Sequence, residues 1–244
     1  MSGTIFNCER NDSPEERFMW LLRFANFKRI KDFLAKNQSL DLNYPTPSLK
    51  TPLTAAIDRG DPQILSLLLE KNSTTLDDTI AQPCRRTALM YAAFVSRNTE
   101  ILQTLLKKGA DLQKTDTRGW TCLSYAIVGE RLQNVTFLLD HGASVNQQNF
   151  QGRTPLMISV YLSNLDIVSL LLDRGAAIDA RDNAGFTALQ IAIFSRKRDP
   201  VVVLIERGCD ANVVTPSTKA SVGDLCRTCM PNVLRCLEQK SRIL

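Results

Sequence analysis

The stretch QGRTPLMISVYLSNLDIVSLLLDRGAA, residues 151–177, decides the fold of this chain. Thr154 stands just before an apolar run, where its hydroxyl can cap a helix by accepting an orphan backbone N–H. Pro155 suits the first helical turn, where no N–H is needed. A second run over residues 167–172 has the wide apolar stripe of a helix, and Gly175 supplies a left-handed helix stop. The stretch therefore predicts two helices joined by a turn and closed by a glycine.

The same pattern occurs five times along the chain. Its first helices align on a shared leucine that recurs at spacings of 36, 34, 33 and 33 residues: Leu53, Leu89, Leu123, Leu156 and Leu189. One such unit cannot bury its own apolar stripe, whereas stacked copies can bury it against one another. A multi-part pattern at a nearly fixed period is typical of a solenoid built from repeats.

This pattern resembles the ankyrin repeat, which runs Gly-x-Thr-Pro-Leu, two alanines, Ile-Val, three leucines and then Gly-Ala before a turn. Residues 49–212 show the pattern clearly, and residues 151–176 match it best. The resemblance implies an all-α solenoid of about six to seven helix-turn-helix repeats with β-hairpin-like tips and degenerate capping repeats at both ends. The chain departs from the family at the histidine that usually follows the leucine, where it carries Thr54, Met90, Ser124, Met157 and Gln190.

We expect one repeat domain over residues 14–244, preceded by a loose tail over residues 1–13. We expect the opening repeat to consist of two short helices over residues 18–25 and 30–34, joined by residues 26–29. A degenerate closing repeat is expected over residues 216–239. An extended loop is expected over residues 72–85. The approximate repeats are 14–46, 47–82, 83–116, 117–149, 150–182, 183–215 and 216–244.

Composition restricts the class of protein. The chain has 244 residues, of which 44% are apolar and 23% charged, a balance that argues against a disordered or collagenous chain. Its longest apolar runs are far short of the ~20 residues that cross a bilayer. Residues 1–10 do not resemble a secretory signal, and the seven cysteines are read as reduced thiols, so we expect a cytoplasmic or nuclear protein. One histidine argues against a histidine-rich metal centre.

The candidate binding residues follow from the resemblance. In an ankyrin stack, the hairpin tips and the solvent side of each first helix line a concave groove, where a stack without a partner should be polar. This chain instead places aromatic and apolar residues there, rimmed by arginines, as in protein-binding hot spots. The candidates are Arg86, Phe94, Arg118, Trp120, Phe150, Arg153, Tyr161, Leu162, Phe186 and Phe194. Most weight falls on Trp120 with Tyr161 and on Phe186 with Phe194.

The sequence thus predicts a non-enzymatic adaptor that binds a protein or peptide with apolar and some acidic residues, without a cofactor. Burial of these side chains in the core is the competing interpretation. No phosphate loop, GxSxG, HExxH or nucleophile–base set is present. The net charge of +5 is mild for a nucleic-acid binder.

Two other functions remain open. The first is a nucleic-acid or phosphate-surface binder that uses basic positions; it predicts a steep fall of affinity with salt. Those positions are Lys50, Arg86, Arg118, Arg153, Arg181 and residues 196–198. The second is the substrate receptor of an elongin–cullin ubiquitin ligase, because residues 221–227 partly resemble the start of a SOCS box.

The cysteines near the end of the chain have two interpretations. Cys226 and Cys229 form a CxxC pair, with Cys236 after it and Cys209 before it. Four thiolates could hold zinc, but the spacing from Cys209 is unlike that of common zinc modules. Packing as small apolar side chains is the favoured interpretation.

Overall fold

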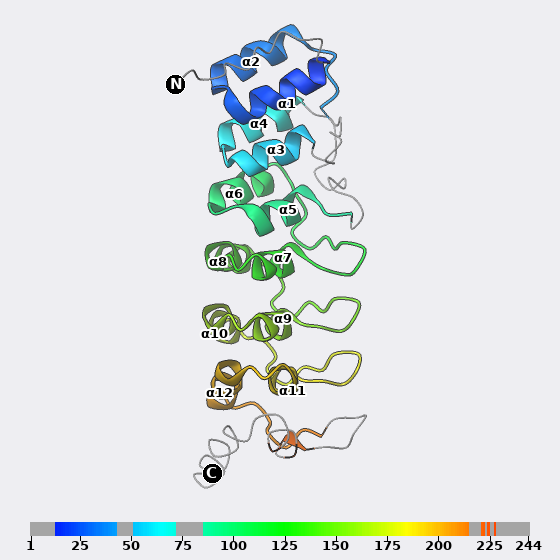
Figure 1. Cartoon of the computed structure of the whole chain (residues 1–244), viewed down its shortest axis with the longest axis vertical. Helices are drawn as coiled ribbons and strands as arrows, with labels where there is room; N and C mark the ends of the chain where they lie inside the picture. The colour runs from blue at the N-terminus through cyan, green and yellow to red at the C-terminus, as the bar shows by residue number, and fades with distance from the viewer. Residues whose placement is uncertain are drawn as a thin grey trace, which may run out of the picture. The chain divides into compact units, whose positions relative to one another are not determined.

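The computed structural model describes residues 13–42, 51–71 and 85–214, together with Ser221, Val222, Asp224 and Arg227. Within these residues, twelve helices follow one another in pairs (Figure 1). The chain divides into two compact units, residues 1–111 and residues 112–244. Cys226, Cys229, Cys236, Lys50, the tail 1–12, the loop 72–84 and nearly all of the predicted closing repeat lie outside the described residues.

The first unit contains three helix pairs. Its helices are α1 (Pro14–Phe24), α2 (Phe27–Lys36), α3 (Pro52–Arg59), α4 (Pro62–Lys71), α5 (Ala88–Val95) and α6 (Thr99–Lys107). The first helices of successive pairs pack on one another, and so do the second helices. The opening pair is longer than predicted, because the side chains of Ser13 and Asn26 accept backbone N–H groups and start a helix at Pro14 and at Phe27.

The second unit repeats this arrangement three times. Its helices are α7 (Cys122–Val128), α8 (Leu132–Asp140), α9 (Pro155–Leu162), α10 (Leu165–Asp173), α11 (Ala188–Phe194) and α12 (Arg198–Glu206). In Figure 1 a loop projects on one side ahead of each of the first helices α7, α9 and α11. These loops correspond to the hairpin-like tips that the resemblance implies, and the described helices repeat as all-α pairs, as predicted.

The predicted threonine caps are confirmed. Five threonines, one in each repeat, accept the backbone N–H of the residue three positions later with their side-chain oxygen: Thr51, Thr87, Thr121, Thr154 and Thr187. All but Thr51 are buried, and each opens a first helix. A cap of this kind typically stabilises a helix by about 1 kcal/mol, which matters for helices of only seven or eight residues.

Other side chains replace the absent histidine in two of the repeats. The hydroxyl of Thr54 accepts the N–H of Thr51 at 2.9 Å and donates to its carbonyl at 2.8 Å. The amide oxygen of Gln190 accepts the N–H of Thr187 at 3.0 Å, and its nitrogen donates to the carbonyl of Val213 at 3.4 Å. Gln190 is fully buried, so it ties the start of α11 to the chain beyond α12.

Ion pairs link the ends of successive second helices. In the second unit, Arg174 pairs with Asp140 at 2.7 Å, and Arg207 pairs with Asp173 at 2.6 Å. In the first unit, Lys108 pairs with Glu70 at 3.4 Å. The side chains are 35–62% exposed, so each pair contributes less than about 1 kcal/mol.

The joints between paired helices store backbone strain. Glu130, Ser163 and Arg196 occupy equivalent joints with φ angles of 54°, 63° and 55°. Non-glycine residues rarely adopt this left-handed region, whereas the joint between α3 and α4 uses Gly60 with φ of 74°. The hydroxyl of Ser163 is also buried and has no hydrogen-bond partner within the described residues.

We expect Ser163→Gly to stabilise the protein by about 1 kcal/mol, because glycine relieves the positive φ and removes the buried hydroxyl. The midpoint of thermal unfolding measures this gain. Ser195→Gly is the matched control, since Ser195 caps α11 with φ of −80° and gains nothing from glycine. A lower midpoint for Ser163→Gly than for the unaltered protein would contradict the strain argument.

Candidate partner-binding surface

Each tip of the second unit is a five-residue turn held by one side-chain oxygen. We call these turns the fingertips: residues 116–120, 149–153 and 182–186. In each, the Oδ1 atom of the first residue (Asp116, Asn149 or Asp182) accepts the N–H groups of the third and fifth residues at 2.8–3.0 Å. The N–H of the first residue donates to the carbonyl of the fifth at 3.0 Å. The fingertips are therefore fixed by their own backbone.

Backbone hydrogen bonds also join one fingertip to the next. The N–H of Phe150 donates to the carbonyl of Arg118 at 3.0 Å, and the N–H of Asn183 donates to that of Gln151 at 3.0 Å. This approach requires glycine as the fourth residue of the turn. Gly119 has φ of 76°, and a Cβ atom there would lie 2.8 Å from the nitrogen of Phe150. The spacing of the three fingertips is thus set by their backbones.

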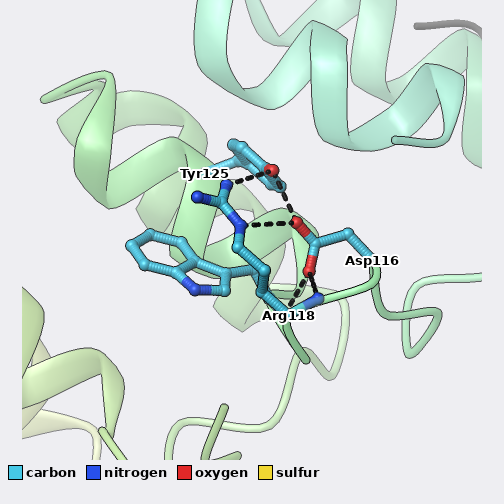
Figure 2. Close-up of polar contacts among 4 residues, drawn as sticks. Asp116, Arg118 and Tyr125 are labelled. Atoms are coloured by element: carbon cyan, nitrogen blue, oxygen red, sulfur yellow. Dashed lines mark hydrogen bonds and ion pairs between the residues drawn. The ribbon is translucent and has the colours of Figure 1, made fainter. Parts of the chain in front are cut away.

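The first fingertip carries an additional polar network (Figure 2). The Oδ2 atom of Asp116 accepts the hydroxyl of Tyr125 at 2.8 Å and lies 3.5 Å from Nε of Arg118. Arg118 also donates to the Tyr125 hydroxyl at 3.2 Å. The Asp116 side chain is fully buried, while that of Arg118 is 52% exposed. A buried carboxylate with four donors around it holds the arginine in one place.

The arginine in turn lies over an aromatic ring. Its guanidinium carbon is 5.3 Å from the ring centroid of Trp120, within cation–π distance. The Trp120 ring also contacts Tyr125, with centroids 5.9 Å apart. Trp120 is half-buried, so one part of its ring packs and the rest faces solvent. Within the described residues, the aromatic ring in contact with Trp120 is that of Tyr125, not that of Tyr161.

Further aromatic side chains extend into solvent. Phe150 is 69% exposed, Tyr161 56% and Phe194 46%. The ring of Phe194, at the end of α11, contacts half-buried Phe186 edge to face, with centroids 5.4 Å apart. We call these rings, which come from three successive repeats of one unit, the aromatic surface: Trp120, Phe150, Tyr161, Phe186 and Phe194.

The remaining candidates have different surroundings. Arg153 is exposed at the second fingertip, and Leu162 is half-buried at the end of α9. Arg86 and Phe94 belong to the first unit, where both are half-buried. The structure therefore brings Arg118 together with Trp120 and Phe186 together with Phe194, and it places Arg86 and Phe94 in a separate unit.

In the first unit, a hydrogen bond joins the first helices of two successive pairs. The hydroxyl of Tyr91, on α5, donates to Oδ1 of Asp58, on α3, at 2.6 Å. Burial raises the pKa of Tyr91 well above its ordinary value of 10, and the hydrogen bond and charge of Asp58 raise it further. The charge of Arg86 acts on this pKa in the opposite direction.

Two important residues escape the sequence interpretation. Tyr125 lies two residues after the repeat leucine, where the repeats carry no common residue type, and Asp116 was not singled out by the repeat pattern. The signal that could have found Asp116 is Asx-x-x-Gly, which begins seven residues before the repeat leucine in three successive repeats. Asp116, Asn149 and Asp182 fill that position, and an aspartate or asparagine followed by glycine is typical of a tight turn.

The comparisons with known proteins agree with this architecture. A family model described as ankyrin repeats (three copies) matches residues 18–116, 74–149 and 145–215. The chain belongs to the ankyrin-repeat family. Proteins of this family are typically non-enzymatic interaction proteins, so membership supports a general role in protein binding.

Relatives share parts of this ankyrin-repeat protein. The ankyrin repeat domain-containing protein SAT10 of Stachybotrys chartarum is 36% identical over 92 residues, which are 36% of this chain and 5% of that protein. An ankyrin repeat protein of Rickettsia bellii is 31% identical over 124 residues, 49% of this chain and 35% of that protein. This chain thus matches only a minor part of each relative's length.

The crystal structure of the ankyrin repeat domain of Bcl-3, described as a unique member of the IkappaB protein family, is similar with a TM-score of 0.77. It shares 24% sequence identity and covers 93% of this chain and 99% of its own. At that identity the likeness shows the fold alone. Among the described residues, no helix is long and apolar enough to cross a membrane.

We expect Asp116→Ala to destabilise the protein by about 2–4 kcal/mol, because it leaves two backbone N–H groups and the Tyr125 hydroxyl without their buried acceptor. Asp116→Asn should cost less, since Asn149 holds the next fingertip with a neutral amide. Urea unfolding measures both. The control is Asp182→Asn, which alters the same turn without a tyrosine partner; an equal cost at both sites would argue against the network.

The pKa of Tyr91 predicts a dependence on alkaline pH. Its stabilising effect is fully present below about pH 10, the ordinary phenol pKa, and is lost as the pH rises through the higher folded-state value. The tyrosinate absorbance of the unaltered protein minus that of Tyr91→Phe should therefore show no ionisation near pH 10. Asp58→Asn should move the ionisation of Tyr91 back toward that value. An ordinary titration of Tyr91 in the unaltered protein would refute the expectation.

Proposed function

We propose that this ankyrin-repeat protein is a non-enzymatic adaptor that binds a segment of a partner protein on the aromatic surface of its second unit. The observation that carries the proposal is the exposure of Phe150, Tyr161 and Phe194, which lie on two consecutive repeats. Large rings left 46–69% exposed lose contact with water only when a partner covers them.

The backbone that carries these rings supports the proposal because its conformation is fixed by internal hydrogen bonds in the absence of a partner. Trp120, Phe150 and Phe186 belong to fingertips fixed by side-chain and backbone hydrogen bonds. Phe194 is held by its contact with Phe186. A surface with few rotamers to lose pays less entropy on binding, which favours affinity. Aromatic anchors of this kind carry most of the binding energy in protein interfaces.

The arginines favour a partner with acidic residues among its apolar ones. Arg153 is exposed on the middle one of the three fingertips, residues 149–153. Its guanidinium makes no hydrogen bond or ion pair within the described residues. Arg118 is 52% exposed, but it lies beside the buried carboxylate of Asp116. Arg181 donates to the carbonyl of Gly185 at 3.0 Å. Two of the cations that a nucleic acid would need are thus already engaged, which favours a protein partner.

The test is a photo-crosslinker placed directly on the surface. Benzoylphenylalanine at position 194 or 150 should crosslink a discrete partner in an extract of native cells, because both side chains already face solvent. The matched control is position 132, since Leu132 is an apolar side chain of the same unit, 39% exposed on a second helix. The same bands from position 132, or no band from positions 150 and 194, would refute the surface.

A second arm measures affinity for the partner so identified. Phe150→Ala with Phe194→Ala should weaken binding by at least about 100-fold, as expected for two hot-spot rings, whereas Leu132→Ala should change it little. Raising the salt from about 50 to 200 mM should weaken binding less than about tenfold. A fall of about a thousandfold or more over that range would instead indicate nucleic-acid binding.

A further inference from the structure

We infer that the opening helix pair of the first unit carries a second binding site, for an acidic peptide segment with one bulky apolar side chain. The site is a pocket of about 480 Å³ on α1 and α2. Eight of the described residues line it: Arg17, Trp20, Leu21, Arg29, Asp32, Phe33, Lys36 and Asn37. None of them belongs to the aromatic surface, so this proposal is independent of the function proposed above.

The helical spacing of the sequence places these residues on facing sides of the two helices. On α2, Arg29, Phe33 and Lys36 recur at intervals of four and three residues and therefore share one face. On α1, Arg17 and Leu21 share a face by the same rule. Each helix thus contributes both an apolar side chain and a cation to one pocket, which is the composition of a specific binding site.

The apolar part of the pocket is built on well-packed side chains. Leu21 is buried, and the ring of Phe33 stacks on fully buried Phe18 with centroids 5.7 Å apart. Trp20 is 36% exposed at the rim, where its ring contacts that of Phe24, which is 68% exposed. A capping repeat is expected to present a polar outer face, so this exposed aromatic pair is unusual for its position.

The charged part of the pocket lacks internal compensation. Among the described lining residues, Arg17, Arg29 and Lys36 supply three cations, and Asp32 supplies one carboxylate. Within the described residues, these three side chains make no ion pair, whereas Lys108, Arg174 and Arg207 on other second-helix ends each pair with a carboxylate. Unpaired cations beside a partly desolvated apolar wall attract carboxylates more strongly than cations in bulk water.

The apolar wall and the cations of the pocket together indicate which ligand it binds. A free phosphate ion would leave the Trp20 and Phe33 rings uncovered. A peptide with glutamates on both sides of a leucine satisfies both parts of the pocket, because the leucine covers the rings and the glutamates meet the arginines and the lysine.

The experiment uses the full chain labelled with 5-fluorotryptophan, which gives one ¹⁹F resonance for each of Trp20 and Trp120; Trp20→Phe assigns them. The probe is the peptide acetyl-Glu-Glu-Leu-Glu-Glu-amide. We expect it to shift the Trp20 resonance saturably and to leave that of Trp120 in place. Replacing the leucine by glycine, or the glutamates by lysines, should weaken binding at least about tenfold, or 1.4 kcal/mol.

Charge reversal locates the site. Arg29→Glu with Lys36→Glu should weaken the probe at least about tenfold, whereas Lys28→Glu, on the same helix outside the pocket, should change it less than about threefold. Unchanged circular dichroism confirms folding of these surface variants. Equal weakening by Lys28→Glu, equal binding of the lysine peptide, or no shift of Trp20 at millimolar probe would overturn the proposal. A concentration-dependent dimer broken by Arg29→Glu would assign the pocket to a second copy instead.

Discussion

One contact governs the second unit: a single side-chain oxygen at the start of each fingertip accepts two backbone N–H groups. Asp116, Asn149 and Asp182 make this contact with nearly the same geometry. Because the turn is closed from within, the next fingertip can approach its backbone closely enough for a direct hydrogen bond. The aromatic residues within these turns are thereby presented from a fixed frame instead of from mobile loops.

The three fingertips are alike in backbone but not in chemistry. Asp116 uses its second oxygen to hold Tyr125 and Arg118, and so fixes a cation over the Trp120 ring. At Asn149 the equivalent atom is an amide nitrogen, which has no hydrogen-bond partner within the described residues. The first fingertip is therefore the one whose polar interactions are most complete, and its arginine is the most constrained of the candidate cations.

Much of the fold could be predicted from the sequence because its signals are local. Threonine caps, the repeat leucines and the closing glycines act within one or two turns, and the structure uses Thr154 and Gly175 as expected. The candidate binding residues were harder to predict, because the exposure of a side chain depends on how the repeats pack. Phe150 and Trp120 are both aromatic candidates at predicted tips, yet Phe150 is 69% exposed and Trp120 is held by Tyr125. No local pattern in the sequence predicts that the Tyr125 hydroxyl reaches back nine residues to donate to Asp116.

The ion pairs along the second helices give the stack a direction. In the second unit, Asp173 forms an ion pair with Arg207 of the following repeat, and Arg174 forms one with Asp140 of the preceding repeat. The repeat 150–182 thus carries adjacent acidic and basic residues that pair with its two neighbouring repeats. Repeats of this kind can be duplicated, lost or exchanged in register without leaving an unmatched charge inside the array. Such modularity lets the length of the array evolve separately from the side chains that its fingertips display.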